Sequence, residues 1–371
     1  MSPDFVGECR LSNVECRMPR GRSHRLPSLM AASAILLAGC AQPRVDRATS
    51  NRVDLRRRAM ECLKAAVAYR YNPVVRVEAV EALKGVQNAD GLPWIRSALL
   101  DDHPAVRFAA CVAVGEVGDA GAEAGVAKCL KDADAAVRVA ALFARHRLGH
   151  TERTGDLAGY LLNDPDATVR RNAALVLGLL GERGAVKILA KGMKDADAGV
   201  RDHALEAMAR LGNREARQEL TFMTGAGVGS DEVFAINALA ATGDPAYAET
   251  FHYKLATATH LETRLAAARG LGLLHSDDGF AVALGGLRRD RPMRSDPQDP
   301  AEGRILRTQQ LAAAALGAIG RTDALPALTE VMEKSDDPRV QVSAARAILD
   351  ILDAERTKAF PLAGGRGSPE R

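Results

Sequence analysis

The sequence has few aromatic residues and little net charge, and both shortages exclude classes of function. Aromatic residues make up 4% of the 371 residues, and the formal net charge is +3. Scarce aromatic side chains leave few platforms on which nucleic-acid bases could stack. Interspersed charges of both signs give no strong field to attract a polyanion. We therefore expect no nucleic-acid partner.

Motifs that carry chemistry are also missing. The sequence has no glycine-rich phosphate loop, no Gly-x-Ser-x-Gly turn and no His-Glu-x-x-His helix, and no two of its six cysteines have the two-residue spacing of a zinc or redox site. His146 and His150 are separated by Gly149, which we expect to end a helix, and His252 and His260 are two turns apart. The sequence thus predicts no cofactor, no metal and no catalytic residue.

Two cysteines, Cys111 and Cys129, fall at apolar positions of expected helices. A free cysteine at such a position acts as a small hydrophobic residue. A disulfide between the two in an oxidising compartment is the alternative.

The strongest positive feature is a unit of about 31 residues that occurs nine times. Its clearest copies read Pro104-Ala105-Val106-Arg107, an alanine-rich run, and then glycine. Aligning the copies gives one equivalent position, which we call the Arg slot, occupied in turn by Arg76, Arg107, Arg138, Arg170, Arg201, Glu232, Arg264, Gln309 and Gln341. A fixed period in this range indicates a solenoid, in which each unit covers the apolar faces of its neighbours.

Each unit reads as two helices joined by a tight turn. In residues 119–149, Asp119 can cap a first helix beginning near Ala120, and Asp134 can cap a second helix that ends at Leu148. Gly149 then follows, where a helix C-terminal cap favours positive φ. The sequence therefore predicts an all-α, right-handed α-solenoid of about nine two-helix repeats over residues 55–354.

This pattern of aspartate, Val-Arg, alanines and glycines resembles HEAT repeats, specifically the short type named after phycobilisome lyases. The resemblance implies a ladder between neighbouring units, formed by turn aspartates and helix arginines. The residues implicated are Asp101 or Asp102 with Arg107, Asp132 or Asp134 with Arg138, Asp164 with Arg170, and Asp195 or Asp197 with Arg201. Arg76 and Arg264 belong to the same row. An anion-binding stripe is the competing interpretation, but a fully paired arginine has little charge left to offer a ligand.

The resemblance also places the second helices on the concave side, where a partner could bind. One face of those helices carries Val112, Phe143, Leu175 and Leu179, followed by the polar Glu206, Arg210 and Arg269. An apolar groove beside a charged one suits an extended peptide or a partner helix. The alternative is that Phe143 and Leu175 pack against the next unit.

The amino-terminal region resembles a bacterial lipoprotein signal. Arg20, Arg22 and Arg25 precede an apolar stretch of about 13 residues, which is too short to span a bilayer, and Leu37-Ala38-Gly39-Cys40 resembles the lipobox. The resemblance implies cleavage before Cys40 and its lipidation. Membrane attachment would then hold the protein in the cell envelope, with the outer membrane favoured.

Acidic residues at Asp4, Glu8 and Glu15 suit no signal peptide, so we interpret residues 1–17 as a mis-assigned extension and 18–39 as the signal. If residues 1–17 are translated, a cytoplasmic location is the alternative. We expect a flexible tether over 40–54, an irregular insertion over 288–303 and a disordered tail over 355–371.

Together these features predict a monomeric, non-catalytic scaffold that binds a protein or peptide. Two enzyme families share the repeat, the phycobilin lyases and deoxyhypusine hydroxylase, so a repeat-built enzyme of either type is the alternative function. The hydroxylase binds iron through His-Glu dipeptides, and this sequence contains none.

Overall fold

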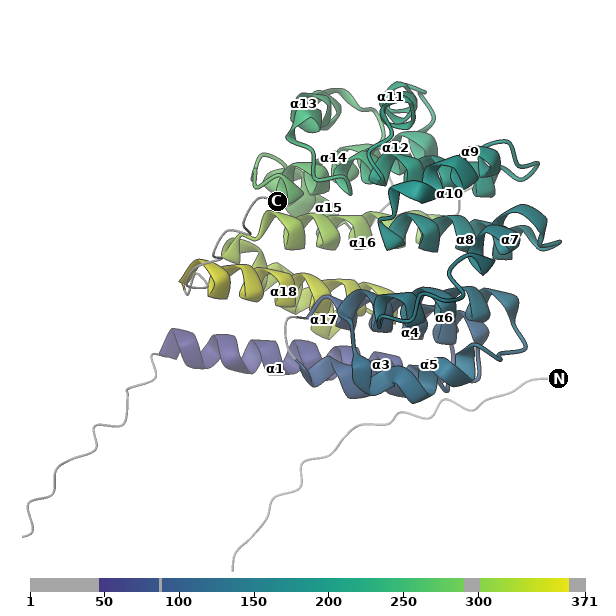
Figure 1. Ribbon diagram of the computed structural model, residues 1–371. Coiled ribbons are helices and arrows are strands. Elements are labelled where there is room, and N and C mark those ends of the chain that lie inside the picture. Colours follow the sequence, from purple (N-terminus) through teal and green to yellow (C-terminus); the bar gives the residue numbers. More distant parts are fainter. Residues whose placement is uncertain (1–46, 87–88, 290–300, 360–371) are drawn as a thin grey trace, which may run out of the picture. The chain divides into compact units, whose positions relative to one another are not determined.

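The computed structural model describes residues 47–86, 89–289 and 301–359, and all regular structure within them is helical. The helices are α1 (Arg47–Val67), α2 (Pro73–Lys84), α3 (Leu92–Ala98), α4 (Pro104–Val117), α5 (Glu123–Cys129), α6 (Ala135–Arg147), α7 (Asp156–Asn163), α8 (Ala167–Leu180), α9 (Val186–Gly192), α10 (Ala198–Arg210), α11 (Arg214–Met223), α12 (Gly229–Ala240), α13 (Ala248–Thr257), α14 (Leu261–Leu273), α15 (Phe280–Leu287), α16 (Ala301–Ile319), α17 (Leu325–Lys334) and α18 (Pro338–Ala359). The predicted all-α solenoid is confirmed (Figure 1).

The local signals in the sequence produce the expected hairpins. Asp119 caps a short 3₁₀ turn ahead of α5, and Asp134 accepts hydrogen bonds from the main-chain N–H groups of Ala136 and Val137 at the start of α6. Gly149 follows α6 with a φ of 98°, a conformation that is strained for residues with a Cβ atom. Helix α5, the first helix of this unit, is shorter than expected because the chain forms a 3₁₀ turn over Ala120–Ala122 before it.

Helices pair in chain order into nine units, from α1 with α2 to α17 with α18. The second helix of each unit packs against the second helix of the next, whereas successive first helices touch little. We call the even-numbered helices the inner row. The array curves toward this row because its helices approach one another most closely.

Glycines on the inner row permit this close approach. A Cβ atom on Gly178 of α8 would lie 2.7 Å from the Cβ atom of Ala207 on α10, and one on Gly115 would lie 2.6 Å from the ring of Phe143. Neither contact is tolerable, so a larger residue at either position would push the two helices apart. Small residues therefore set the curvature.

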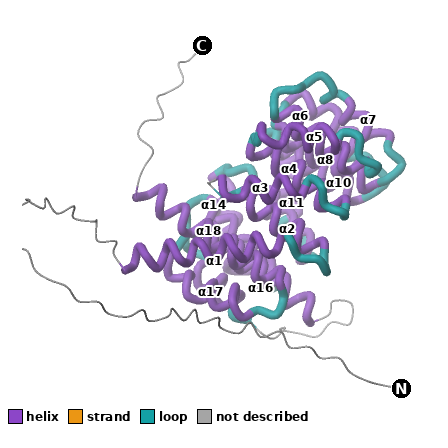
Figure 2. The backbone as a smooth tube through the Cα atoms, turned by 90° about the horizontal axis from the view of Figure 1, so that it is seen from below, coloured by secondary structure: helices purple, strands orange, loops and turns teal. Residues whose placement is uncertain are grey.

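The described array closes on itself. Helix α18 of the ninth unit packs against both α1 and α2 of the first unit, and both views show α18 beside α1 (Figures 1 and 2). Arg56 on α1 pairs with Asp353 at 2.5 Å, and the Arg346 guanidinium donates to the main-chain oxygen of Ala82 at 2.6 Å. The repeat period did not predict this contact, because closure depends on small rotations summed over nine units.

Three predicted boundaries are wrong by a few residues. Helix α1 begins at Arg47, inside the range assigned to the tether, because residues 47–54 continue the helix that buries Leu55 and Ala59. Helix α18 extends to Ala359, inside the range assigned to the tail, and α16 begins at Ala301, inside the insertion. The rest of the tether, insertion and tail lies outside the described residues, as do residues 1–17, the signal 18–39 and Cys40.

No helix in the described part of the chain is both long enough and apolar enough to cross a membrane.

Candidate functional site

The Arg slot of the early units makes two kinds of contact. Arg107 donates from Nη1 to the main-chain oxygen of Asp101 at 2.8 Å, which ties down the turn of its own unit. Its other face reaches the next unit, where Nε and Nη2 donate to the two carboxylate oxygens of Asp132 at 2.7 and 2.9 Å. Such a bidentate, charge-assisted pair is among the stronger hydrogen-bonded contacts in proteins.

The same arrangement recurs with variations along the row. Arg170 pairs with Asp195 at 2.8 and 2.9 Å, and Arg76 reaches Asp101 and Asp102 at 2.8 and 2.6 Å. Arg138 instead donates to the Tyr160 hydroxyl at 3.2 Å. The partners assigned within each unit are therefore wrong: each of these arginines binds main-chain oxygens of its own turn. Where one binds a carboxylate, as Arg107 and Arg170 do, the aspartate belongs to the following unit, so the ladder runs between neighbouring units there.

These contacts shift the aspartate pKa values as ion pairs should. The hydrogen bond from Arg107 holds the pKa of Asp132 below its ordinary value, and Arg170 does the same for Asp195. Both aspartates also accept a main-chain hydrogen bond two residues along, in the turn of their own unit. The row is thus occupied with structural contacts and presents no open anion stripe.

The Arg slots from the fifth unit onward lack the bridge to an aspartate. Arg201 is exposed and donates to the main-chain oxygens of Asp195 and Ala196. Arg264 donates to the oxygen of Leu255, and Gln341 donates to that of Ser335 at 2.6 Å. These side chains therefore bind main-chain oxygens of their own unit and do not bridge to an aspartate of the next unit.

The sixth unit reverses the charges of the bridge. Glu232 fills the Arg slot and accepts a hydrogen bond from Lys254 of α13 at 2.9 Å. The side chains of Glu232 and Lys254 are only 7% and 11% exposed. Since a buried charge needs a partner, each of these residues depends on the other.

The predicted apolar groove does not exist as an open surface. Val112 is 7% exposed and Phe143 is 1% exposed, with the Phe143 ring packed beside Gly115 of the preceding unit. Leu175 and Leu179 are half-buried, and Leu179 packs against the core. The prediction is wrong for Val112 and Phe143 because the glycine draws the neighbouring helices together over these side chains.

The polar part of the predicted surface divides between two places. Glu206 and Arg210 pair with each other on α10 at 3.0 Å. Arg269 on α14 lies instead in a cavity between helices of the inner row.

This cavity is the candidate functional site, and we call it the inner cavity. Its volume is about 840 Å³, and residues of α2, α12, α14, α16 and α18 line it. The first unit contributes to it because the array closes. Its charged residues are Glu78, Glu81, Lys84, Arg269, Arg307, Arg346 and Asp350. Its larger apolar residues are Val233, Leu273, Leu311 and Val342. A concave site of this size with a few convergent polar groups is typical of ligand binding.

Several of the charged groups in the inner cavity have partners on its wall or beside it. Lys84 pairs with Glu116 at 2.6 Å, and Arg346 pairs with Asp350 at 2.8 Å. The Gln310 amide donates to both carboxylate oxygens of Glu78 at 3.1 Å. The first of these contacts links α2 to α4 and the third links α16 to α2, while the pair of Arg346 and Asp350 lies within α18.

Burial has opposite effects on the acids and the arginine of the cavity wall. It raises the pKa of the Glu78 and Asp350 carboxyls and lowers the pKa of the Arg269 guanidinium. In each case the surrounding protein penalises the charged form. The inner cavity is therefore a place where charge is poorly solvated.

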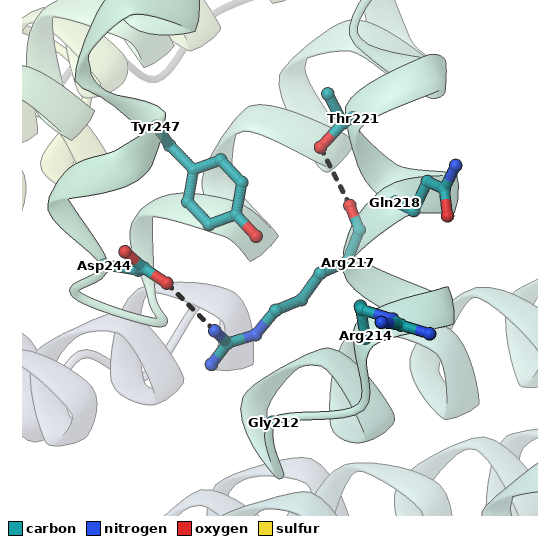
Figure 3. A pocket seen from close by; sticks show the side chains of 7 residues that line it. All are labelled: Gly212, Arg214, Arg217, Gln218, Thr221, Asp244 and Tyr247. Carbon is teal, nitrogen blue, oxygen red and sulfur yellow. Dashed lines mark hydrogen bonds and ion pairs between the residues drawn. The ribbon is translucent and has the colours of Figure 1, made fainter.

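A second hollow, of about 410 Å³, lies on the first helices and has a structural explanation. Figure 3 shows Arg217 of α11 reaching Asp244, with a distance of 3.0 Å, while Tyr247 flanks the pair. Asp244 also caps the 3₁₀ turn ahead of α13. Arg96 and Asp119 form the equivalent link between α3 and the turn ahead of α5. This hollow thus surrounds a link between two units.

The remaining candidates lie apart from the inner cavity. Cys111 and Cys129 are buried free thiols, so the predicted hydrophobic role fits them in this structure. His252 lies 3.6 Å from Asp278, while His146 and His150 each contact a glutamate. Among the described residues, no three histidine, cysteine or acidic side chains are placed to hold a metal ion.

Comparison with known proteins supports the assignment of the repeats. Residues 60–145 and 156–228 match the family model of HEAT repeats, and residues 309–334 match the model of the PBS lyase HEAT-like repeat. No curated protein matches the chain. The predicted resemblance of the repeats is therefore confirmed at the level of the repeat.

Several solved structures are similar to the chain at low identity. The complex of CpcE and CpcF of phycocyanin lyase from Nostoc sp. PCC7120 is 21% identical, with a TM-score of 0.41, over 60% of this chain and 91% of that chain. Human deoxyhypusine hydroxylase in complex with glycerol is 17% identical, with a TM-score of 0.36, over 82% and 99%. A structure of Kap95p with RanGDP is 13% identical, with a TM-score of 0.34, over 84% and 47%.

Proposed function

We propose that this HEAT-repeat protein is a non-catalytic scaffold that binds a segment of a protein partner in its inner cavity and is anchored in the cell envelope through a lipid on Cys40. The observation that carries the binding proposal is the inner cavity itself. Helices of the first unit and of the sixth to ninth units line it, and its wall combines charged residues with apolar ones. Such a wall suits a peptide, which offers both main-chain polar groups and side chains.

The anchoring half of the proposal is supported by sequence. Basic residues, an apolar stretch too short to span a bilayer, and Leu37-Ala38-Gly39-Cys40 stand in the order of a lipoprotein signal. Acyl chains partition into membranes with about 0.8 kcal/mol per buried methylene, so several chains together hold a protein firmly.

Photo-crosslinking tests the binding proposal. A photoreactive residue at Leu273, which lines the inner cavity and is 41% exposed, is expected to give a discrete crosslinked protein in cells that express the full chain. The same residue at Phe222, which is 73% exposed on α11, is the matched control. Equal crosslinking at both positions, or none at Leu273, would contradict binding in the cavity.

Labelled palmitate tests the anchor. We expect incorporation into the full chain, its loss in Cys40→Ala and its retention in Cys62→Ala. Incorporation that survives Cys40→Ala would contradict lipidation at Cys40.

A further inference from the structure

Arg269 differs from Lys84 and Arg346 of the inner cavity because its hydrogen-bond partner is neutral. Its guanidinium donates from Nη1 to the Asn237 side-chain oxygen of α12 at 3.2 Å. A guanidinium carries five N–H donors in a planar fork, and an amide oxygen satisfies few of them. Lys84 and Arg346, by contrast, each have a carboxylate partner.

The surroundings of Arg269 favour an anion over water. Burial is the main influence on this side chain and lowers its pKa, while the Asp350 charge acts in the opposite sense. Asp350 itself is engaged by Arg346 at 2.8 Å. The cavity thus holds a poorly solvated cation whose nearest acid already serves another arginine.

Helix α16 leaves room for a ligand beside Arg269. It contributes Ala314, Gly317 and Ala318 to the cavity wall between α14 and α18. The small side chains of Ala314 and Ala318 leave space that larger ones would fill, whereas Gly317 packs closely against Ala347 of α18. Leu273, one turn beyond Arg269 on α14, and Val233 on α12 add apolar surface next to the guanidinium.

From these contacts we infer that the inner cavity binds a carboxylate-bearing ligand, with Arg269 as the residue that holds the carboxylate. A carboxylate matches the guanidinium fork with two parallel hydrogen bonds, which a lysine could not provide. The apolar neighbours fit a short hydrophobic group beside the carboxylate. This inference deepens the proposed function, because a partner's C-terminus or acidic side chain would supply such a group. A free small carboxylate is the other source of the same chemistry.

The test uses the full chain and a probe with a matched neutral analogue. N-acetyl-leucine carries a carboxylate beside an apolar side chain, and N-acetyl-leucinamide lacks the charge. Calorimetry is expected to show binding of the acid that is at least tenfold tighter than binding of the amide. In Arg269→Gln, which keeps amide hydrogen bonding but loses the cation, the acid should bind at least tenfold more weakly than in the parent chain.

The controls separate a local effect from a folding defect. Arg214→Gln removes an arginine whose side chain is 91% exposed on α11, and it should bind the acid as the parent chain does. Arg269→Lys keeps the charge without the fork and should give an intermediate affinity. Circular dichroism melting checks that each variant folds. Equal binding of acid and amide, unchanged binding by Arg269→Gln, or a preference for inorganic phosphate would overturn the inference.

Crosslinking at Leu273 in the Arg269→Gln background identifies the source of the carboxylate. A loss of crosslinked partner assigns the carboxylate to the protein partner. Retained crosslinking with lost N-acetyl-leucine binding assigns it to a free small molecule. If no partner crosslinks in any background, the scaffold proposal fails, while the calorimetry still decides the carboxylate inference.

Discussion

The first four units and the last five are joined to their neighbours in different ways. Arg76, Arg107, Arg138 and Arg170 each reach a polar side chain of the following unit, and three of these four arginines reach aspartate. From the fifth unit onward the only bridge of this kind among the described residues is the reversed pair of Glu232 and Lys254. The repeat therefore uses two alternative ways to fix one unit to the next.

The comparison separates two tasks that a single arginine performs in the early units. One task is to bind main-chain oxygens near its own turn, and the other is to bridge to the next unit. Gln341 shows that a neutral side chain suffices for the first task. The second needs a side chain long enough to reach an acceptor in the next unit, as Arg107 does. Close packing of the inner row is common to both regions, as where Gly178 meets Ala207 and Gly317 meets Ala347.

The late units also supply most of the inner cavity. Helices α12, α14, α16 and α18 line it, together with α2. Arginines in these units, such as Arg269 and Arg346, lie on the cavity wall and not in the Arg slot. The early units use their Arg-slot arginines to join neighbouring units, whereas we propose that Arg269 of the late units meets a ligand.

The largest effect should come from breaking the reversed bridge. Lys254→Met leaves Glu232 charged and buried without its cationic partner, so we expect the free energy of unfolding to fall by about 3–5 kcal/mol. Urea unfolding followed by circular dichroism measures this change. Adding Glu232→Gln to Lys254→Met removes the stranded charge and should restore part of the loss. A fall of less than about 1 kcal/mol in the single variant would show that the pair does not join the two units.

A smaller effect is expected when an early unit receives the residue of a late one. Arg107→Gln keeps an amide that can bind the turn but loses the bidentate bridge to Asp132. The free energy of unfolding should fall by about 1.5–3 kcal/mol, as for hydrogen bonds to charged groups. Arg201→Gln is the matched control, because Arg201 contacts only main-chain oxygens, and its effect should stay within about 0.5 kcal/mol. Equal effects of the two substitutions would remove the distinction between early and late units.

The smallest expected effect is a difference in pH dependence between the two regions. The pKa of Asp132 is lowered in the folded state, so its contribution to stability is present at neutral pH. It is lost as the pH falls below the ordinary aspartate value of about 3.9 and through the lower folded pKa. The pKa of Asp350 is raised by burial, so this residue destabilises the fold at neutral pH. That penalty is relieved as the pH falls through its raised folded pKa.

Urea midpoints measured between pH 7 and pH 3 test these opposite signs. In a plot of urea midpoint against pH, Asp132→Asn should flatten the curve at the most acidic pH values. Asp350→Asn should flatten it at higher pH values, near the raised pKa of Asp350. A change of the same sign in both variants would contradict the assignment of the two environments.

Much of the repeat could be predicted from sequence, because its signals are local. The period, the capping by Asp134 and the glycine at Gly149 each depend on a few neighbouring residues. The partner of Arg107 and the burial of Phe143 could not be predicted in this way, because they depend on how one unit sits against the next. The inner cavity could not be predicted from the sequence either, because it forms only where the first and ninth units meet.

The contact of α18 with α1 and α2 also affects whether the chain can gain or lose a repeat unit. An open array tolerates the duplication or deletion of one unit, because only nearest neighbours are affected. In this chain a tenth copy would separate Arg56 from Asp353 and Arg346 from the main chain of Ala82, and it would remove one wall of the inner cavity. The copy number of the repeat is thus tied to the contacts between the first and ninth units.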